Sequence, residues 1–169
     1  GSGDGQFNEP VGIALDSSNN VYVADSSNNR IQKFDSSGNF LAKWDDYGTN
    51  DGQFDRPSGV TVSPSGNIYV VENGNNRIQK FDSSGNFLTK WGSLAYMVYG
   101  SPNDGKLGLP IASAVDSSGN IYVTDMLNNR IQKFDPSGNF LAKWGSQGSG
   151  DGQFNGPVGI ALDSSNNVY

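Results

Sequence analysis

Residues 10–35 have the sequence PVGIALDSSNNVYVADSSNNRIQKFD, and close copies of this stretch begin again at Pro57, Pro110 and Pro157. Each copy contains short runs rich in β-branched and aromatic residues, such as VYVA, separated by clusters of Asp, Ser, Asn and Gly. Such runs favour β-strands, and the polar clusters are typical of tight turns. No apolar period of 3.6 residues accompanies them, so the sequence predicts strands and no helices.

The first prolines of successive copies are 47, 53 and 47 residues apart, so the repeat is 47 residues long and the second copy carries six extra residues before Pro110. Four strands fit each copy, and four strands in 40–50 residues are typical of a β-propeller blade. We therefore expect a single array over residues 1–169, with blades at about 7–47, 54–94 and 107–147 and a partial blade at 154–169. In the first copy the expected strands are Val11–Leu15, Val21–Ala24, Arg30–Phe34 and Asn39–Trp44.

The quoted stretch resembles the NHL repeat, whose pattern is P-x-G-I-A-x-D followed by G-N-I-Y-V-A-D-x-x-N-H-R-I-Q-x-F, and the resemblance covers essentially the whole chain. One position departs from the pattern, because the family's His before Arg is Asn here, at Asn29, Asn76 and Asn129. The resemblance implies an all-β fold of four-stranded antiparallel propeller blades, most often six to a ring. The first strand of each blade would line the central channel and the fourth would form the rim. The chain would supply about half of a six-bladed ring.

Three blades do not close a ring, and an open arc exposes strand edges that can pair with other chains. Residues 148–169 copy residues 1–22 with one difference, Gly156 in place of Glu9. Three alternatives follow: a window of a longer array, an engineered or recently amplified fragment, or a homodimer that closes a six-bladed ring by two-fold symmetry. In the dimer, the first strand of one chain and its copy at the end of the other chain would compete for the same position in the ring.

Residues that recur in every blade are expected to be structural. An acid precedes an Arg by five residues in each copy, and we expect the two to form an ion pair across the turn between the second and third strands. A Trp closes each fourth strand and is expected to pack between blades. These structural residues are Asp25 and Arg30, Glu72 and Arg77, Asp125 and Arg130, and Trp44, Trp91 and Trp144.

Departures from the repeat are the expected place for binding, since functional loops vary on a constant scaffold. In a propeller the B–C loops, which join the second and third strands, emerge on the same face as the D–A loops, which join successive blades. The six extra residues fall in the second D–A loop, within Ser93–Gly105. The apolar residues there and in the third B–C turn predict a contact site or a small local core. These residues are Leu94, Tyr96, Met97, Val98, Tyr99, Met126 and Leu127.

The first D–A loop departs as well, at Asp45, Asp46, Tyr47 and Arg56, which we include among the candidate partner-binding residues. Acidic residues gather on the same face at Asp45, Asp46, Asp51, Asp55 and Glu72, and several carboxylates together could bind Ca²⁺. The spacing of an EF-hand loop is absent, so solvated loops are the favoured interpretation and no metal site is predicted.

Several classes of function are disfavoured. The chain has no His and no Cys, which removes His-based catalytic triads, and no cofactor is predicted. The net charge is −6 and the eleven Lys and Arg residues are scattered, so nucleic acid is not an expected partner. No apolar run approaches 18 residues, so no membrane span is expected.

The favoured function is therefore a non-enzymatic binding or scaffold module that presents its B–C and D–A loops to a protein or carbohydrate partner. The expected self-association is a homodimer, or the chain continues as a longer array. The alternatives are a self-assembling structural fragment without a ligand and a Ca²⁺-assisted enzyme on the carboxylate-bearing face. The acidic composition, rich in Gly, Asn and Ser, weakly favours an extracellular or cell-surface location.

Overall fold

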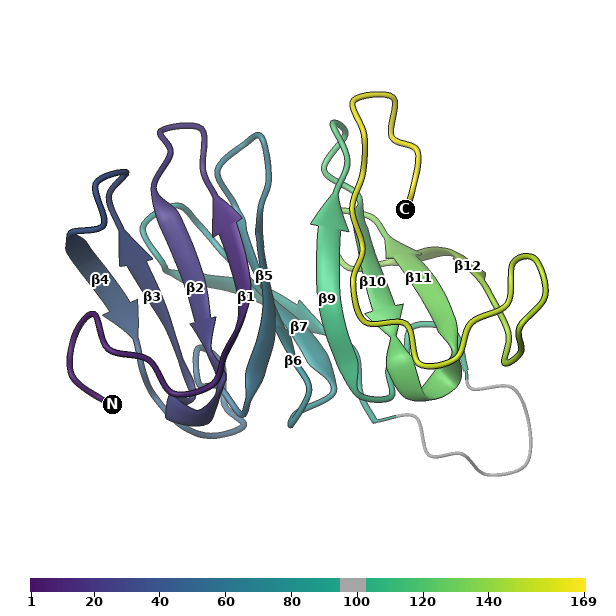
Figure 1. Cartoon of the computed structure of the whole chain (residues 1–169), viewed down its shortest axis with the longest axis horizontal. Coiled ribbons are helices and arrows are strands. Elements are labelled where there is room, and N and C mark those ends of the chain that lie inside the picture. The colour runs from purple at the N-terminus through teal and green to yellow at the C-terminus, as the bar shows by residue number, and fades with distance from the viewer. Residues whose placement is uncertain (95–102) are drawn as a thin grey trace.

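The computed structural model describes residues 1–94 and 103–169, in which three four-stranded antiparallel sheets lie side by side (Figure 1). In each sheet the strands are paired in chain order, so each is a simple meander. The all-β, propeller-blade fold class is thereby confirmed. The first sheet contains β1 Pro10–Leu15, β2 Val21–Asp25, β3 Arg30–Phe34 and β4 Phe40–Trp44; the second contains β5 Pro57–Val62, β6 Ile68–Glu72, β7 Arg77–Phe81 and β8 Phe87–Trp91; the third contains β9 Pro110–Val115, β10 Ile121–Asp125, β11 Arg130–Phe134 and β12 Phe140–Trp144.

The expectation of no helix was wrong in detail at two B–C turns. Ser26–Asn28 and Met126–Asn128 each form a single 3₁₀ turn, η1 and η2. The N–H of Asn29 donates to the carbonyl of Ser26 at 3.0 Å to close the first one. A turn of three residues is too short to produce an apolar period, which is why the sequence pattern did not indicate it.

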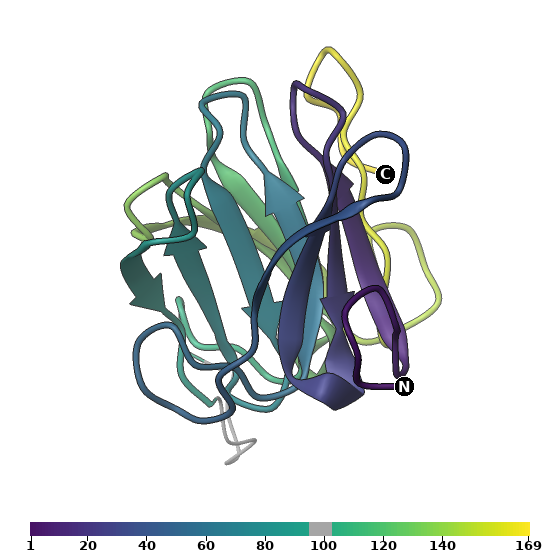
Figure 2. The same cartoon turned by 90° about the vertical axis from the view of Figure 1, so that its left-hand side faces the viewer.

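The three sheets stack face to face, and their first strands lie together along one side (Figures 1 and 2). Apolar side chains fill the two spaces between sheets. Tyr22 and Ile31 of the first sheet pack with Phe81 of the second and with Phe54 from the loop before it, and a corresponding core joins the second sheet to the third. These cores hold the blades in sequence order, as a propeller requires.

Trp44 and Trp91, which end the fourth strands of the first two blades, reach the next blade. Trp91 lies 6.1 Å from Phe134 of the third sheet, measured between ring centroids. A Cβ at Gly85, in the C–D turn of the second blade, would lie 1.9 Å from Nε1 of Trp44. Gly85 also has a φ of +86°, so the turn needs glycine both for its backbone conformation and to leave room for the Trp of the preceding blade. Trp144 lies 6.1 Å from Tyr122 of its own sheet.

The turns opposite the B–C face are closed by their own side chains. Asp35 Oδ1 accepts hydrogen bonds from the N–H groups of Ser37 and Asn39 at 2.9 and 2.8 Å, and the Asn39 side-chain amide donates to Oδ2 at 2.8 Å. These bonds from Asn39 hold the pKa of Asp35 below its ordinary value. The same arrangement recurs at Asp16, Asp82, Asp116, Asp135 and Asp163. These six turns are therefore alike and internally satisfied, whereas the A–B turn of the second blade begins with Ser63, whose Oγ accepts from the N–H of Asn67 at 3.1 Å.

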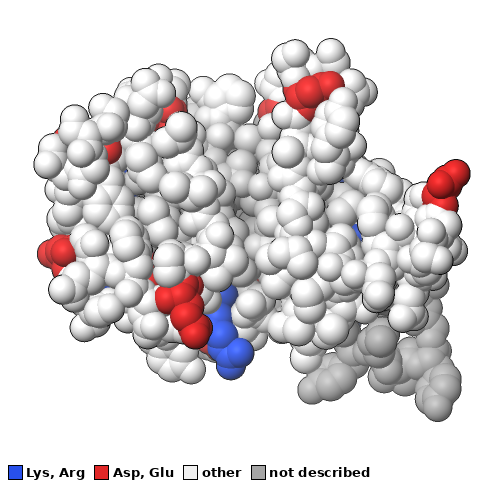
Figure 3. Space-filling view, viewed as in Figure 1, with Lys and Arg blue, Asp and Glu red and all other residues white. Residues whose placement is uncertain are grey.

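The inner strands β1, β5 and β9, with residues 158–160, line an open trough of about 260 Å³. Figure 3 shows the side of the molecule seen in Figure 1, and its charged side chains lie scattered toward the margins. A Cβ at Gly12 would come within 2.7 Å of the Ser58 carbonyl oxygen, so glycine permits the close approach of β1 to β5. Within the described ranges, no helix is long and apolar enough to cross a membrane.

Candidate functional site

A buried ion pair lies beneath the B–C loop of every blade. The Arg Nε donates to the acid at 2.7 Å in the pair Arg30–Asp25, and at 2.6 Å in the pairs Arg77–Glu72 and Arg130–Asp125. The acids are fully buried, and the Arg side chains are at most 7% exposed. The ion pairs expected across the B–C turn are therefore present in all three blades.

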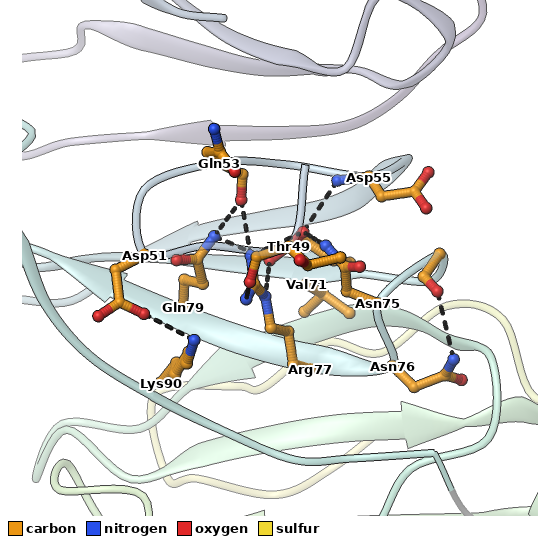
Figure 4. A network of polar contacts seen from close by, with 12 residues as sticks. Thr49, Asp51, Gln53, Asp55, Val71, Asn75, Asn76, Arg77, Gln79 and Lys90 are labelled. Carbon is orange, nitrogen blue, oxygen red and sulfur yellow. Dashed lines mark hydrogen bonds and ion pairs between the residues drawn. The ribbon is translucent and has the colours of Figure 1, made fainter. Parts of the chain in front are cut away.

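Each Arg also holds the loop segment that leads into its own blade, and Figure 4 shows these contacts for Arg77. Arg77 donates through Nη1 to the carbonyl oxygen of Thr49 at 2.6 Å, and through Nη2 to those of Asn50 and Gln53 at 3.1 and 2.7 Å. Arg30 makes the same contacts to residues 2, 3 and 6. The sequence predicts for each Arg only a partner in its own turn, whereas in the structure each Arg also fixes a second loop.

A buried Gln, which the sequence pattern did not indicate, completes this network. Gln79 Oε1 accepts from the N–H of Gly52 at 2.9 Å, and its Nε2 donates to the Gln53 carbonyl at 2.7 Å and to Glu72 at 2.9 Å. Gln32 and Gln132 have the same position and are also fully buried. The only signal in the sequence was the recurrence of Gln two residues after each Arg.

The Asn that replaces the family's His connects successive blades. Asn29, Asn76 and Asn129 adopt left-handed backbone conformations with φ of 52°, 52° and 50°. Asn tolerates this region better than most residues. The Oδ1 atoms accept from the backbone N–H of Arg56, Leu109 and Gly156 at 2.8, 2.9 and 2.8 Å. Each acceptor is thus in one blade and each donor begins the next.

A hollow of about 310 Å³ opens on the B–C face between the first two blades, lined by Ser27, Asn29, Tyr47, Asp55 and Arg56. Tyr47 is 68% exposed, and the Arg56 side chain is 70% exposed with Nε 3.8 Å from Asp55 Oδ1. Two of the predicted residues, Tyr47 and Arg56, therefore meet at one site. Ser27, Asn29 and Asp55 complete it and were not predicted as binding residues.

The other candidates of the first D–A loop lie apart from this hollow. Asp45 pairs with Lys43 at 3.0 Å, and the backbone carbonyl of Asp46 accepts from Phe54 at 2.7 Å. Asp51 pairs with Lys90 at 2.6 Å. The carboxylates of this face are dispersed, and among residues 1–94 and 103–169 no three acidic side chains come together in a group that could hold a metal ion.

The apolar candidates are only partly described. Leu94 is 40% exposed and forms a bridge with the buried Leu107. Leu127 is 42% exposed, and its N–H donates to the Gly108 carbonyl at 3.0 Å, while Met126 lies beside Gly156. Tyr96, Met97, Val98 and Tyr99 lie outside the described residues.

Comparison with known proteins agrees with this architecture. The family model described as NHL repeat matches residues 7–34 and 54–81. No curated protein matches the chain. Among solved structures, virginiamycin B lyase from Staphylococcus aureus is 19% identical with a TM-score of 0.66, over 94% of this chain and 47% of that one. Hydrazine synthase from Kuenenia stuttgartiensis is 12% identical with a TM-score of 0.68, over 95% of this chain and 42% of that one.

A protein of unknown function from Bacteroides thetaiotaomicron is 18% identical with a TM-score of 0.72, over 94% of this chain and 43% of that one. The chain thus spans less than half the length of each of these proteins, and identities this low show the fold alone. The repeat match and the four-stranded sheets lead to one assignment: the chain contains NHL repeats, matched at residues 7–34 and 54–81, and is built of β-propeller blades.

Proposed function

We propose that this chain is a non-enzymatic binding and scaffold module whose B–C and D–A loops contact a protein or carbohydrate partner. The hollow formed by Ser27, Asn29, Tyr47, Asp55 and Arg56 is the proposed contact site. The observation that carries this proposal is the exposure of Tyr47 and Arg56 at a concave site between two blades.

The loops around the hollow are held in place from below. The N–H of Arg56 donates to Asn29 Oδ1 of the preceding blade, and the N–H of Asp55 donates to the buried Glu72 at 3.0 Å. The Arg77 network fixes residues 49–53 of the same loop. A loop fixed in this way loses little conformational freedom on binding, which favours affinity.

The residues that line the hollow suit a ligand that combines polar groups with a flat surface on which a ring can stack. The exposed ring of Tyr47 can stack on a sugar ring or an apolar side chain. Arg56 supplies several N–H donors, and Asp55 supplies carboxylate acceptors. Tyr and Arg are also enriched among the residues that contribute most to binding at protein interfaces.

Virginiamycin B lyase and hydrazine synthase, two of the structural neighbours, are enzymes, but the composition of this chain favours a binding role. A catalytically inactive virginiamycin B lyase from Staphylococcus aureus is a variant in which one His is replaced by Ala. These 169 residues contain no His, and they therefore cannot reproduce a catalytic step that depends on an imidazole. The dispersed carboxylates of the B–C face do not favour the Ca²⁺-assisted alternative either.

The proposal can be tested by screening the full chain against a glycan array and a displayed peptide library, followed by affinity measurements on any hit. Tyr47→Ala and Arg56→Ala should each weaken binding by roughly 10-fold or more, as expected for removing a central contact residue. Leu88→Ala is the matched control, because Leu88 is 49% exposed on the outer strand β8. A hit that binds all variants equally, or the lack of any hit, would argue against this site.

A further inference from the structure

The chain contains the same segment twice, at opposite ends of the array. We call residues 1–22 the head and residues 148–169 the tail; they are identical except for Glu9 and Gly156. The head contributes β1, which pairs with β2 from Pro10↔Asp25 to Leu15↔Val21. The tail lies against the third sheet, on the side away from the second (Figure 1).

The tail makes the hydrogen bonds that normally join one blade to the next. The N–H of Phe154 donates to the Ser146 carbonyl at 2.8 Å, and the N–H of Gly156 donates to Asn129 Oδ1 at 2.8 Å. Between the first two blades, Phe54 and Arg56 make the same two bonds, to Asp46 and Asn29, at 2.7 and 2.8 Å. The tail therefore occupies the position of a following blade.

The tail is held less completely than an internal blade. Its inner segment pairs only through the bridge Leu162↔Val168 and the two hydrogen bonds between Ala161 and Tyr169. Val158 remains 56% exposed. The equivalent segment of the head, β1, pairs with β2 at five positions. The contacts of the tail can thus be exchanged at less cost than those of the head.

The head presents the complementary surface without a covering blade. Ile13 is 70% exposed, whereas Val60, at the same repeat position in the second blade, is 5% exposed. Phe7 is 36% exposed, whereas its counterpart Phe54 is 1% exposed. Among the described residues, the N–H of Glu9 has no hydrogen-bond acceptor, although its counterpart at Arg56 donates to Asn29.

We propose that two copies of this chain close one ring, and that the head of each displaces the tail of the other from the third blade. Glu9 N–H would then donate to Asn129 of the partner subunit, and Ile13 would be covered as Val60 is.

The tail consequently acts as an intramolecular competitor of assembly. A segment tethered next to its site has an effective concentration of about millimolar, so it masks the third blade until a second copy arrives. Strengthening the tail should weaken the dimer, and weakening the tail should strengthen it. This inference does not depend on the ligand hollow, whose test uses residues on another surface.

The decisive experiment makes the same substitution in the head and in the tail, as two separate variants. Sedimentation equilibrium of the full chain, 18.0 kDa per copy, should show a reversible dimer. Ile13→Asp removes the head contact and should raise the dissociation constant by at least about 100-fold, because both interfaces of the ring are affected. Ile160→Asp, at the same repeat position in the tail, should lower it by roughly 10-fold as the competitor is lost.

Leu41→Asp is the control, since Leu41 is 50% exposed on the outer strand β4 and should leave the dimer unchanged. Circular dichroism spectra of all three variants should match that of the parent chain, because each residue is exposed or half-buried. The proposal is overturned if the parent chain and Ile160→Asp are both monomeric at every concentration. Equal weakening by Ile13→Asp and Ile160→Asp, or open polymers in place of dimers, would overturn it as well.

Discussion

Replacing Arg77 with Met tests whether the buried polar network holds the second blade to its D–A loop. Arg77 is 6% exposed and donates to Glu72 and to the carbonyl oxygens of Thr49, Asn50 and Gln53. Met has a comparable length but no donors, so Glu72 would remain buried without a cation. Removing one partner of a buried ion pair costs about 3–5 kcal/mol.

A loss of that size should be visible in thermal unfolding. For a chain of this length, each kcal/mol lowers the melting temperature by about 2–4 °C, so Arg77→Met should lower it by roughly 6–20 °C. Arg56→Met is the matched control: the Arg56 side chain is 70% exposed, and its change in stability should stay within about 0.5 kcal/mol.

The double variant Glu72→Gln with Arg77→Met separates the charge from the hydrogen bonds. It should recover part of the lost stability, because the group left buried is then neutral. Calorimetry at neutral pH measures all three variants. The reasoning is refuted if Arg77→Met is no less stable than Arg56→Met, or if the double variant is less stable than Arg77→Met.

Three further predictions concern the blade junctions and turns. Asn76→Gly keeps the left-handed backbone and should lower the free energy of unfolding by about 1 kcal/mol, because the hydrogen bond to Leu109 is lost. Asn76→Ala should lower it further, because Ala is also strained in that conformation, and urea unfolding measures both variants. Phe54→Ala should cost about 3–5 kcal/mol by opening the core between the first two blades, and a smaller loss in the same assay would contradict that packing. The hydrogen bonds from Asn39 lower the pKa of Asp35 in the folded chain. The stability that this shift contributes is present above the ordinary pKa of 3.8 and is lost as the pH falls through the lower folded pKa. Asp35→Asn should therefore reduce the pH dependence of the urea unfolding midpoint below pH 4.

The blades could be predicted because their signals are local. Alternating apolar residues and turn residues recur within each copy, and the observed strands begin and end within one residue of the expected bounds in the first blade. Gln79 and Asn76 could not be assigned in the same way. A Gln between Ile78 and Lys80 has the pattern of a solvent-facing position, and its partners lie 26 and 27 residues away. Only the folded arrangement shows that this side chain is buried.

The candidate site was partly predictable for a related reason. Tyr47 and Arg56 stood out because they depart from the repeat, and the D–A loop brings them together at the hollow. Asp45 and Asp46 departed in the same loop but do not line the hollow. Asn recurs at the position of Asn29 in every blade, so nothing in the repeat marked it as a binding residue, although it also lines the site. Departure from a repeat identifies a variable loop. The residues beside the loop that complete a site can recur in every blade, and the repeat pattern then does not distinguish them from other structural residues.

Equivalent positions in a repeat array are not equally buried, and this bears on function. Ile13 and Val60 occupy the same place in their blades, yet one is 70% exposed and the other 5%. The difference arises from what lies next to each blade, since a first strand is covered only by the blade before it. A repeated apolar position is therefore a potential interface at every copy, and each copy without a preceding blade carries the exposed form. The face that forms the core inside the array, at Val60, is therefore the same face that remains exposed at Ile13.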